Sequence, residues 1–227
     1  MDQPGLDSTQ HEQALHGLAR INWISLSDGI LWKPIRRLAE EKRNQPLRVL
    51  DIATGGGDVP IRLHRRAVRA GLPITFAGVD FSATAVEYAR QQARIGNDAV
   101  DFFQLDALNL PLPADHDVII SSLFLHHLDA DQAVDLLRRM GQAARSMVLI
   151  NDLVRSRMGY LLAYFGTRLL SRSKVVHFDG PQSVRAAFTI AETRQMAEQA
   201  GLKDASISWQ WPCRFLLQWR RQPGIPS

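Results

Sequence analysis

Short apolar runs alternate along this chain with stretches of helical periodicity, and this alternation constrains the fold more than any other feature. Strands buried on both faces read as continuous apolar runs, and parallel strands need a crossover helix between them, so the pattern predicts a parallel α/β sheet. Seven strands are expected, and they are residues 48–52, 74–79, 100–105, 117–122, 146–150, 206–211 and 214–219. Only Pro212 and Cys213 separate the last two strands, so these two are expected to be antiparallel.

Four residues are placed to start helices, because a short polar side chain before a periodic segment can accept a hydrogen bond from the first helical turn. They are Asp58, Ser82, Asp129 and Thr189. Gln132 and Glu192 follow the last two after three residues, which is the pattern of a capping box. The helices that begin at these residues are expected to connect the strands.

A single domain over residues 1–227 is expected, because the length suits one sizeable core. Its four parts are an N-terminal helical cap (1–44), a cofactor-binding core (45–153), a lid insertion (154–188) and a C-terminal helix with a strand pair (189–227). The insertion is too long for a plain crossover loop, and basic residues flank its apolar ones. A lid over a lipophilic acceptor is the favoured interpretation, with plain packing and peripheral membrane contact as the alternatives.

The composition excludes several classes of protein. With 45% hydrophobic and 22% charged residues and only one cysteine, the chain is neither disordered nor a disulfide scaffold. A net charge of +4 is too small to indicate nucleic acid as a partner. No export signal is visible and no apolar stretch approaches about 20 residues, so a cytoplasmic protein without a transmembrane segment is expected. The oligomeric state has no signature in the sequence.

Residues 49–58 run from an apolar strand through a glycine cluster into a helix, and this segment predicts a ligand site. Its glycines allow a ligand to approach the backbone, and the N–H groups of the helix offer donors. Asp80 ends the next strand 23 residues after Gly57, where a carboxylate can bind both hydroxyls of a ribose. Asp106 ends the third strand and can accept a bond from an adenine amino group. Together with Asp51, these acids predict a nucleoside site.

A dinucleotide fits this loop less well. The fingerprint G-x-G-x-x-G would begin at Gly55 and Gly57, but Pro60 holds its third glycine position. Asp58 places a negative charge where a pyrophosphate would bind. A cationic nucleoside that carries an amino acid fits better, and the alternatives are an NAD(P)-dependent oxidoreductase and a catalytically silent nucleoside-binding protein.

Over residues 45–153 the chain resembles the class I S-adenosylmethionine-dependent methyltransferases of the small-molecule type. Their first motif, D-x-G-x-G-x-G, is matched by Asp51–Gly57, with Ala53 in place of the first glycine as in ubiquinone and menaquinone biosynthesis methyltransferases. The K-P-G-G that often precedes strand five is replaced by Gln142–Arg145. The resemblance implies a Rossmann-like, seven-stranded, mostly parallel sheet of order 3-2-1-4-5-7-6, with the last strand antiparallel and a helical cap.

The resemblance also implies which residues hold S-adenosylmethionine. Asp80 would bind the ribose, Asp106 the adenine and the loop at Asp51 the methionine end, and the end of strand four would line the sulfonium side. The expected cofactor-binding residues are Asp51, Ala53, Thr54, Gly55, Gly57, Asp80, Phe81, Asp106, Ala107, Ser121, Ser122 and Arg20. No metal is expected, because the histidines show no ligand spacing with Cys213 or with acidic pairs.

Residues 117–128 resemble the D-x-x-x-S-x-x-x-L-H-H-L stretch of small-molecule members. A histidine at the end of this strand can face both a methyl donor and an acceptor, and an imidazole can take a proton from a phenol or enol at neutral pH. His126 is therefore the predicted general base, and a capping or packing role is the alternative. The predicted acceptor-binding residues are His127, Asp152, His177 and Arg185.

These features predict a methyltransferase that acts on a small aromatic or polyketide-like acceptor, at oxygen rather than at carbon. The ubiquinone-like loop keeps methylation at carbon as an alternative.

Overall fold

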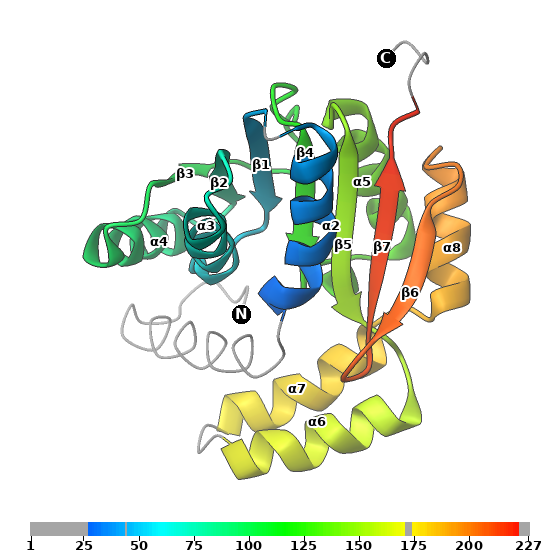
Figure 1. Cartoon of the computed structure of the whole chain (residues 1–227). Coiled ribbons are helices and arrows are strands. Elements are labelled where there is room, and N and C mark those ends of the chain that lie inside the picture. The colour runs from blue at the N-terminus through cyan, green and yellow to red at the C-terminus, as the bar shows by residue number, and fades with distance from the viewer. Residues whose placement is uncertain (1–26, 44, 171–173, 223–227) are drawn as a thin grey trace.

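A seven-stranded sheet runs through the protein in the order β3-β2-β1-β4-β5-β7-β6 (Figure 1). This computed structural model describes residues 27–43, 45–170 and 174–222, without the side chains of residue 27 and residues 165–179. The strands are β1 (Leu47–Ile52), β2 (Ile74–Asp80), β3 (Val100–Gln104), β4 (Val118–Ser122), β5 (Met147–Leu153), β6 (Ser206–Gln210) and β7 (Arg214–Arg220). The strand β7 runs in the opposite direction to the other six strands. The predicted strand order and the antiparallel last strand are confirmed.

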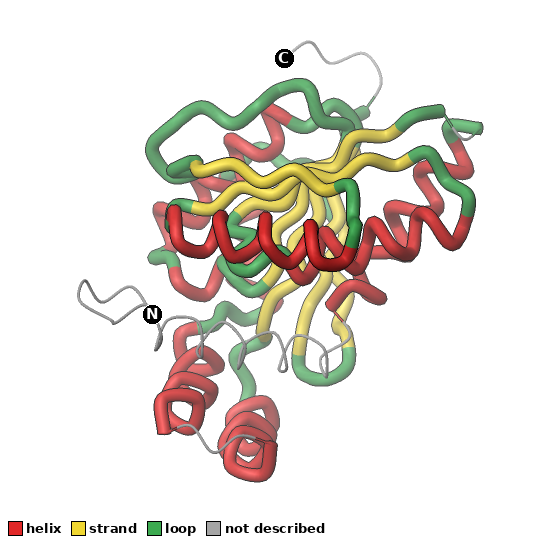
Figure 2. Tube along the Cα trace, turned by 90° about the vertical axis from the view of Figure 1, so that its left-hand side faces the viewer, coloured by secondary structure: helices red, strands yellow, loops and turns green. Residues whose placement is uncertain are grey.

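Helices cover both faces of this sheet, as the view along its edge shows (Figure 2). They are α2 (Ser27–Glu41), α3 (Asp58–Ala70), α4 (Ala83–Gly96), the short 3₁₀ helix η1 (Leu125–His127), α5 (Ala130–Ala143), α6 (Arg157–Leu170), α7 (Lys174–Ala186) and α8 (Ile190–Gln199). The helices α2, α3 and α4 pack on one face, and α5 and α8 pack on the other. The hairpin of α6 and α7 extends past the end of the sheet where β5 ends (Figure 1).

The central strands are buried on both faces, which explains why they read as continuous apolar runs. In β4, Ile119 packs in the cluster under α5 and α8, and Ile120 packs in the cluster under α2 and α3. Both isoleucines have no exposed surface. On α2, Leu31 and Ile35 are also fully buried, so this helix covers the sheet.

The predicted start of α3 is wrong in one detail. Asp58 is not the cap of the helix: Gly57 is the N-cap residue, in the left-handed region at φ +76°, and Asp58 is the first helical residue. Glycine takes this conformation without steric cost, and the Asp58 carboxylate instead pairs with Arg62 one turn later. The caps predicted at Ser82, Asp129 and Thr189 are confirmed, the last two as capping boxes.

The sequence Asp179-Gly180-Pro181 predicts that the segment around His177 is a loop that returns the chain to the sheet, but the structure differs. The segment lies inside α7, although Asp-Gly-Pro is a strong turn signal and proline removes a helical hydrogen bond. The helix packs along α6 in an antiparallel pair, and this packing outweighs the local turn preference. The insertion at 154–188 is therefore a helical hairpin.

None of the described helices is both long and apolar enough to cross a membrane.

We predict that Asp129→Ala lowers the free energy of unfolding by about 1 kcal/mol, because it removes the side-chain acceptor for the Gln132 N–H and the reciprocal capping box. Asp131→Ala is the matched control, since Asp131 lies in the same first turn without a cap bond, and we expect a loss of only about 0.3 kcal/mol. Urea unfolding of both variants measures the difference. Equal losses would contradict the capping role.

Candidate active site

The carboxyl ends of β1, β2, β4 and β5 meet at one edge of the sheet, and most of the predicted site residues lie there. The parallel register places Asp51 on β1 between Gly78 on β2 and Ile120 on β4. It also places Ser122 on β4 beside Asn151 on β5. One parallel sheet thus gathers residues that are up to 100 positions apart, from 51 to 151, along one edge.

The glycine loop after β1 combines one crowded and one open position. A Cβ on Gly57 would lie 2.6 Å from a ring carbon of Phe102 and 2.8 Å from the Cβ of Ala89, so only glycine lets the loop pack on β3 and α4. A Cβ on Gly55 would have no atom within 4 Å other than those of Gly55 and its two chain neighbours. The φ of Gly55 is +54°, in the left-handed region that favours glycine. Ala53 also adopts a positive φ of 55°. The backbone at Gly55 is therefore open to a ligand.

Asp51 is a buried acid with an unused oxygen. Its Oδ2 accepts a hydrogen bond from Thr54 Oγ1 at 2.8 Å, and its Oδ1 has no hydrogen-bond partner among the described residues. Burial raises the pKa of Asp51 to about 8, with the nearby charges of Asp58 and Asp80 acting in the same direction and the Thr54 bond against it. A cationic ligand group could therefore bind to Oδ1 of Asp51 and would favour the ionised carboxylate.

Asp80 connects the end of β2 to the glycine loop. Its Oδ2 accepts a hydrogen bond from Gly55 N at 2.8 Å, and its Oδ1 accepts one from Ser82 N at 2.9 Å. The next side chain, Phe81, is 71% exposed. The two residues place a carboxylate and a free aromatic ring side by side in the chain, next to the open backbone.

Asp106 closes the turn after β3. Its oxygens accept hydrogen bonds from Leu108 N and from both the backbone and the amide group of Asn109. The bond from the Asn109 side chain is the largest cause of a pKa below the usual range for Asp106. The adjacent Ala107 is buried, and its carbonyl accepts a bond from Arg139. Asp106 is thus fixed in place and ionised.

The two serines at the end of β4 point to different partners. Ser121 is buried and donates its hydroxyl to Ile52 O at 3.1 Å, which ties β4 to β1. Ser122 is partly exposed and accepts a bond from Asn151 Nδ2 at 3.1 Å.

His126 on η1 and Asp152 on β5 form a buried pair. His126 Nδ1 lies 2.6 Å from Asp152 Oδ1, and the exposed fractions of the two residues are 6% and 1%. The second oxygen, Oδ2, accepts a bond from Leu125 N at 2.7 Å. The sequence predicts that Asp152 faces an acceptor, but its oxygens are turned toward η1. The structure thus supplies the histidine with an orienting carboxylate.

The surroundings of Asp152 favour its ionised form. Burial acts to raise the pKa of Asp152, but the charge and hydrogen bond of His126 and the N–H groups of Leu153 and Leu125 outweigh it, so the pKa is below its usual range. Arg214 on β7 is also buried, which lowers its pKa to about 10, while the charge of Asp152 opposes that shift. An ionised Asp152 fixes the proton of His126 on Nδ1 and leaves Nε2 as the basic nitrogen.

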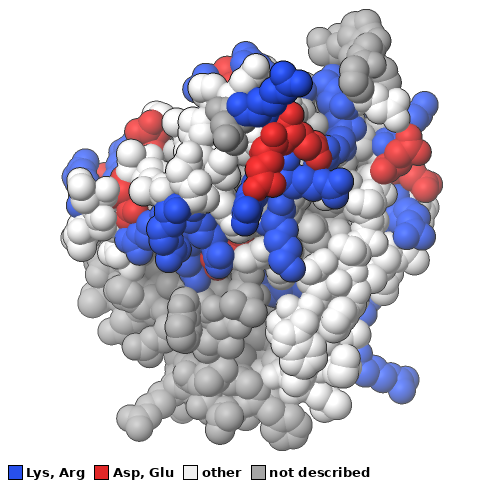
Figure 3. Space-filling model, viewed as in Figure 1, with Lys and Arg blue, Asp and Glu red and all other residues white. Residues whose placement is uncertain are grey.

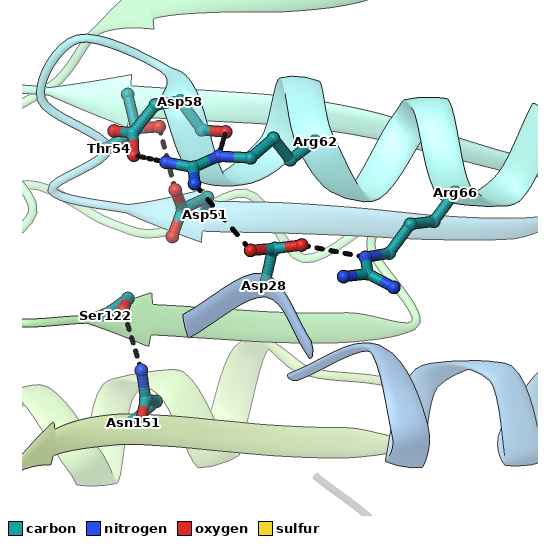
Figure 4. A network of polar contacts seen from close by, with 8 residues as sticks. All are labelled: Asp28, Asp51, Thr54, Asp58, Arg62, Arg66, Ser122 and Asn151. Carbon is teal, nitrogen blue, oxygen red and sulfur yellow. Dashed lines mark hydrogen bonds and ion pairs between the residues drawn. The ribbon is translucent and has the colours of Figure 1, made fainter. Parts of the chain in front are cut away.

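A second polar cluster was not predicted from the sequence (Figure 4). Arg62 on α3 lies 3.8 Å from Asp28 on α2, and its Nη1 has no hydrogen-bond partner among the described residues. Asp28 also binds Arg66 at 2.8 Å. Asn151 Oδ1 is a further buried atom without such a partner in the described part of the chain. In the close view these side chains lie around Asp51, on the face that α2 covers.

The other predicted residues are placed as follows. His127 is exposed, and its ring centroid is 4.2 Å from that of His126. Arg185 on α7 lies over the ring of Tyr160 at 4.7 Å. Arg20 and the side chain of His177 lie outside the described residues. Among the described residues there is no cluster of three or more His, Cys, Asp or Glu that could hold a metal ion.

The comparisons with known proteins agree with this geometry. Residues 49–146 match the family model described as a methyltransferase domain. The predicted resemblance is confirmed for this segment, which contains the glycine loop, Asp80, Asp106 and both histidines.

The names of two curated relatives refer to quinones. The chain is 36% identical to a demethylmenaquinone methyltransferase of Thermus thermophilus over 115 residues, which are 49% of this chain and 50% of that protein. It is 34% identical to a 2-phytyl-1,4-naphtoquinone methyltransferase of Nostoc punctiforme over 40% of this chain and 38% of the relative. The chain thus spans half or less of the length of these curated relatives.

Solved methyltransferases share the fold over nearly the whole chain. Magnesium protoporphyrin IX methyltransferase from Synechocystis, with bound SAH, has a TM-score of 0.60 at 16% identity and covers 98% of this chain and 90% of its own. Human N-acetylserotonin methyltransferase in complex with SAM has a TM-score of 0.68 at 15% identity, over 95% and 56% of the two chains. At these identities the likeness shows the fold alone.

We predict that Gly57→Ala destabilises the methyltransferase domain more than Gly55→Ala does. Both changes place a side chain at positive φ, which costs about 1–2 kcal/mol, but only the methyl group added at position 57 would also clash with Phe102 and Ala89, which adds about 1–3 kcal/mol. Urea unfolding gives the two free energies. Equal losses would show that the packing of the loop on β3 and α4 does not require Gly57.

Proposed function

We propose that this protein is an S-adenosylmethionine-dependent methyltransferase that acts on a small aromatic acceptor, with His126 as the general base for transfer to oxygen. The buried pair of His126 and Asp152 carries the proposal. The match of residues 49–146 to a methyltransferase domain, the methyltransferase relatives and the SAM or SAH bound in solved neighbours support the cofactor.

The residues at the strand ends fit the nucleoside part of this cofactor. Asp80 would accept bonds from the ribose hydroxyls with the lone pairs that Gly55 N and Ser82 N do not use. The exposed ring of Phe81 would stack on the adenine, and Asp106 would accept a bond from its amino group. The open backbone at Gly55 gives the ligand room to approach.

The polar cluster around Asp51 fits the amino-acid part. Asp51 Oδ1 and Asn151 Oδ1 are buried acceptors without hydrogen-bond partners among the described residues, and an ammonium group would satisfy them. Arg62 Nη1 lies 3.8 Å from Asp28 but has no hydrogen-bond partner among the described residues, so a ligand carboxylate could accept a bond from it. A zwitterionic ligand would therefore pair three groups whose burial is otherwise costly, which supports this orientation of the cofactor.

The bound cofactor supplies an activated methyl group and a neutral thioether leaving group. The chain then has to align the acceptor and remove its proton. His126 would take the hydroxyl proton of a phenol at Nε2, because Nδ1 is held by Asp152, and the phenolate oxygen would form the new bond to carbon. Asp152 is a positioning residue in this scheme, as it stabilises the imidazolium without itself accepting the proton.

The acceptor would lie beside η1 and the helical hairpin. The helix α7 packs against η1, so residues 154–188 can form one wall of an acceptor site next to His126. His127 and Arg185 would contribute to this wall. In this proposal the core at residues 45–153 would hold the cofactor, and the insertion at residues 154–188 would face the acceptor.

Methylation at carbon is the second candidate, and the quinone names of the relatives favour it. A phenolate or enolate carries negative charge on oxygen and on ring carbon, so the same base serves both reactions. A panel of phenols and hydroquinones, with O-methyl and C-methyl products separated by mass spectrometry and NMR, distinguishes them.

We predict that His126→Ala and Asp152→Asn each lower kcat about 10²–10⁴-fold on this panel, because the first removes the base and the second fixes the wrong tautomer. The Kd for S-adenosylhomocysteine should stay within about twofold of wild type, since neither residue is in the cofactor set. His64→Ala is the matched histidine control, because His64 on α3 is half-buried against Phe76 and accepts a bond from Ala99 N, outside the proposed site. Unchanged kcat in both site variants would remove the pair from the mechanism, and binding of NAD(H) without S-adenosylhomocysteine would overturn the function.

We predict that S-adenosylhomocysteine binding at pH 7 releases protons from Asp51. Its pKa of about 8 keeps the free carboxyl mostly protonated, and the ligand ammonium favours the ionised form, so affinity should rise with pH up to about 8. Calorimetry in buffers of different ionisation enthalpy measures the release, by up to about one proton per ligand. Asp51→Asn should abolish this component, and an identical proton release in both proteins would contradict the assignment.

A further inference from the structure

The outer side of α6 exposes a stripe of apolar side chains. Met158, Leu161 and Leu162 are 54%, 53% and 44% exposed, and their spacing of three and four residues places them on one helical face. The inner side is set by Gly159, where a Cβ would lie 3.2 Å from Cys213 and 3.3 Å from Val184. A surface helix normally buries its apolar stripe, whereas these three side chains of α6 face outward.

Two tryptophans continue this exposed apolar surface at the edge of the sheet. Trp209 on β6 is 48% exposed and Trp211 in the β6–β7 turn is 63% exposed, with ring centroids 6.3 Å apart. Gly159 packs against Cys213, two residues after Trp211, so the turn and the start of α6 lie at the same end of the molecule. Figures 1 and 2 both show the turn at the end where the hairpin of α6 and α7 extends. We name Met158, Leu161, Leu162, Trp209 and Trp211 the apolar end surface.

The sequence of the insertion that contains α6 carries charged residues of one sign over most of its length. Residues 153–178 include five basic and no acidic residues, namely Arg155, Arg157, Arg168, Arg172 and Lys174. Arg155 pairs with Glu192, whereas Arg157 is exposed in the first turn of α6, directly before Met158. Elsewhere the charges are mixed, and over α2 and α3 basic and acidic side chains lie side by side (Figure 3).

We propose that the apolar end surface binds the surface of an anionic lipid membrane. Tryptophan rings favour the boundary between headgroups and acyl chains, and leucine and methionine side chains insert just below it. Basic side chains without acidic neighbours are attracted to anionic headgroups, by about 1 kcal/mol for each residue near the surface. An acidic headgroup layer over apolar chains matches both properties of this surface. The proposal does not depend on methyl transfer.

Flotation of the full chain with vesicles tests this docking without cofactor or acceptor. We expect binding to vesicles with about 30 mol% phosphatidylglycerol, at least about tenfold weaker binding to pure phosphatidylcholine, and loss of most binding at about 0.5 M NaCl. Tryptophan emission should shift to shorter wavelength on binding. Absence of binding to the anionic vesicles would overturn the proposal.

Paired variants locate the contact. The double change Leu161→Ser and Leu162→Ser, and separately Trp211→Ala, should each lower the vesicle partition coefficient about tenfold or more. Val68→Ser with Ile95→Ser is the matched control, because these side chains are 64% and 72% exposed on α3 and α4. Circular dichroism checks that all variants fold. Equal binding of site and control variants would overturn the proposal, as would a dimer in solution that only the site variants dissociate.

Discussion

The parallel hydrogen bonding of β1 with β2 and β4 is the constraint on which the rest of the structure depends. It aligns strands whose ends are far apart in the chain, so that Asp51, Asp80 and Ser122 reach the same edge. The glycine loop crosses this edge only because Gly57 leaves room for Phe102. Everything proposed for the cofactor and the acceptor is built on the residues that this alignment brings together.

Much of the fold could be predicted because its signals are local. Apolar runs in the sequence indicated the seven strands. Asp129 and Thr189 start helices through hydrogen bonds to residues only three positions later in the chain. The strand order came from the resemblance rather than from any local pattern. Where a local signal failed, at Pro181, packing of α7 against α6 outweighed a turn preference that acts over only a few residues.

The site was less predictable because its decisive contacts join distant elements. Asp152 was assigned to the acceptor, and only the register of β5 beside β4 reveals that it faces His126. Nothing in the sequence of α3 indicates that α2 brings Asp28 close to Arg62. Asn151 has no motif at all. A polar residue directly after an apolar strand is the one signal that was available for it.

Asp152 bonds to the backbone of Leu125 with one oxygen and to His126 with the other, so the histidine is held by the sheet itself. The hairpin of α6 and α7 adds a wall without contributing to that pairing. In the proposed scheme, substitutions in residues 154–188 that face the acceptor would change substrate choice while the two Asp152 bonds still orient the imidazole.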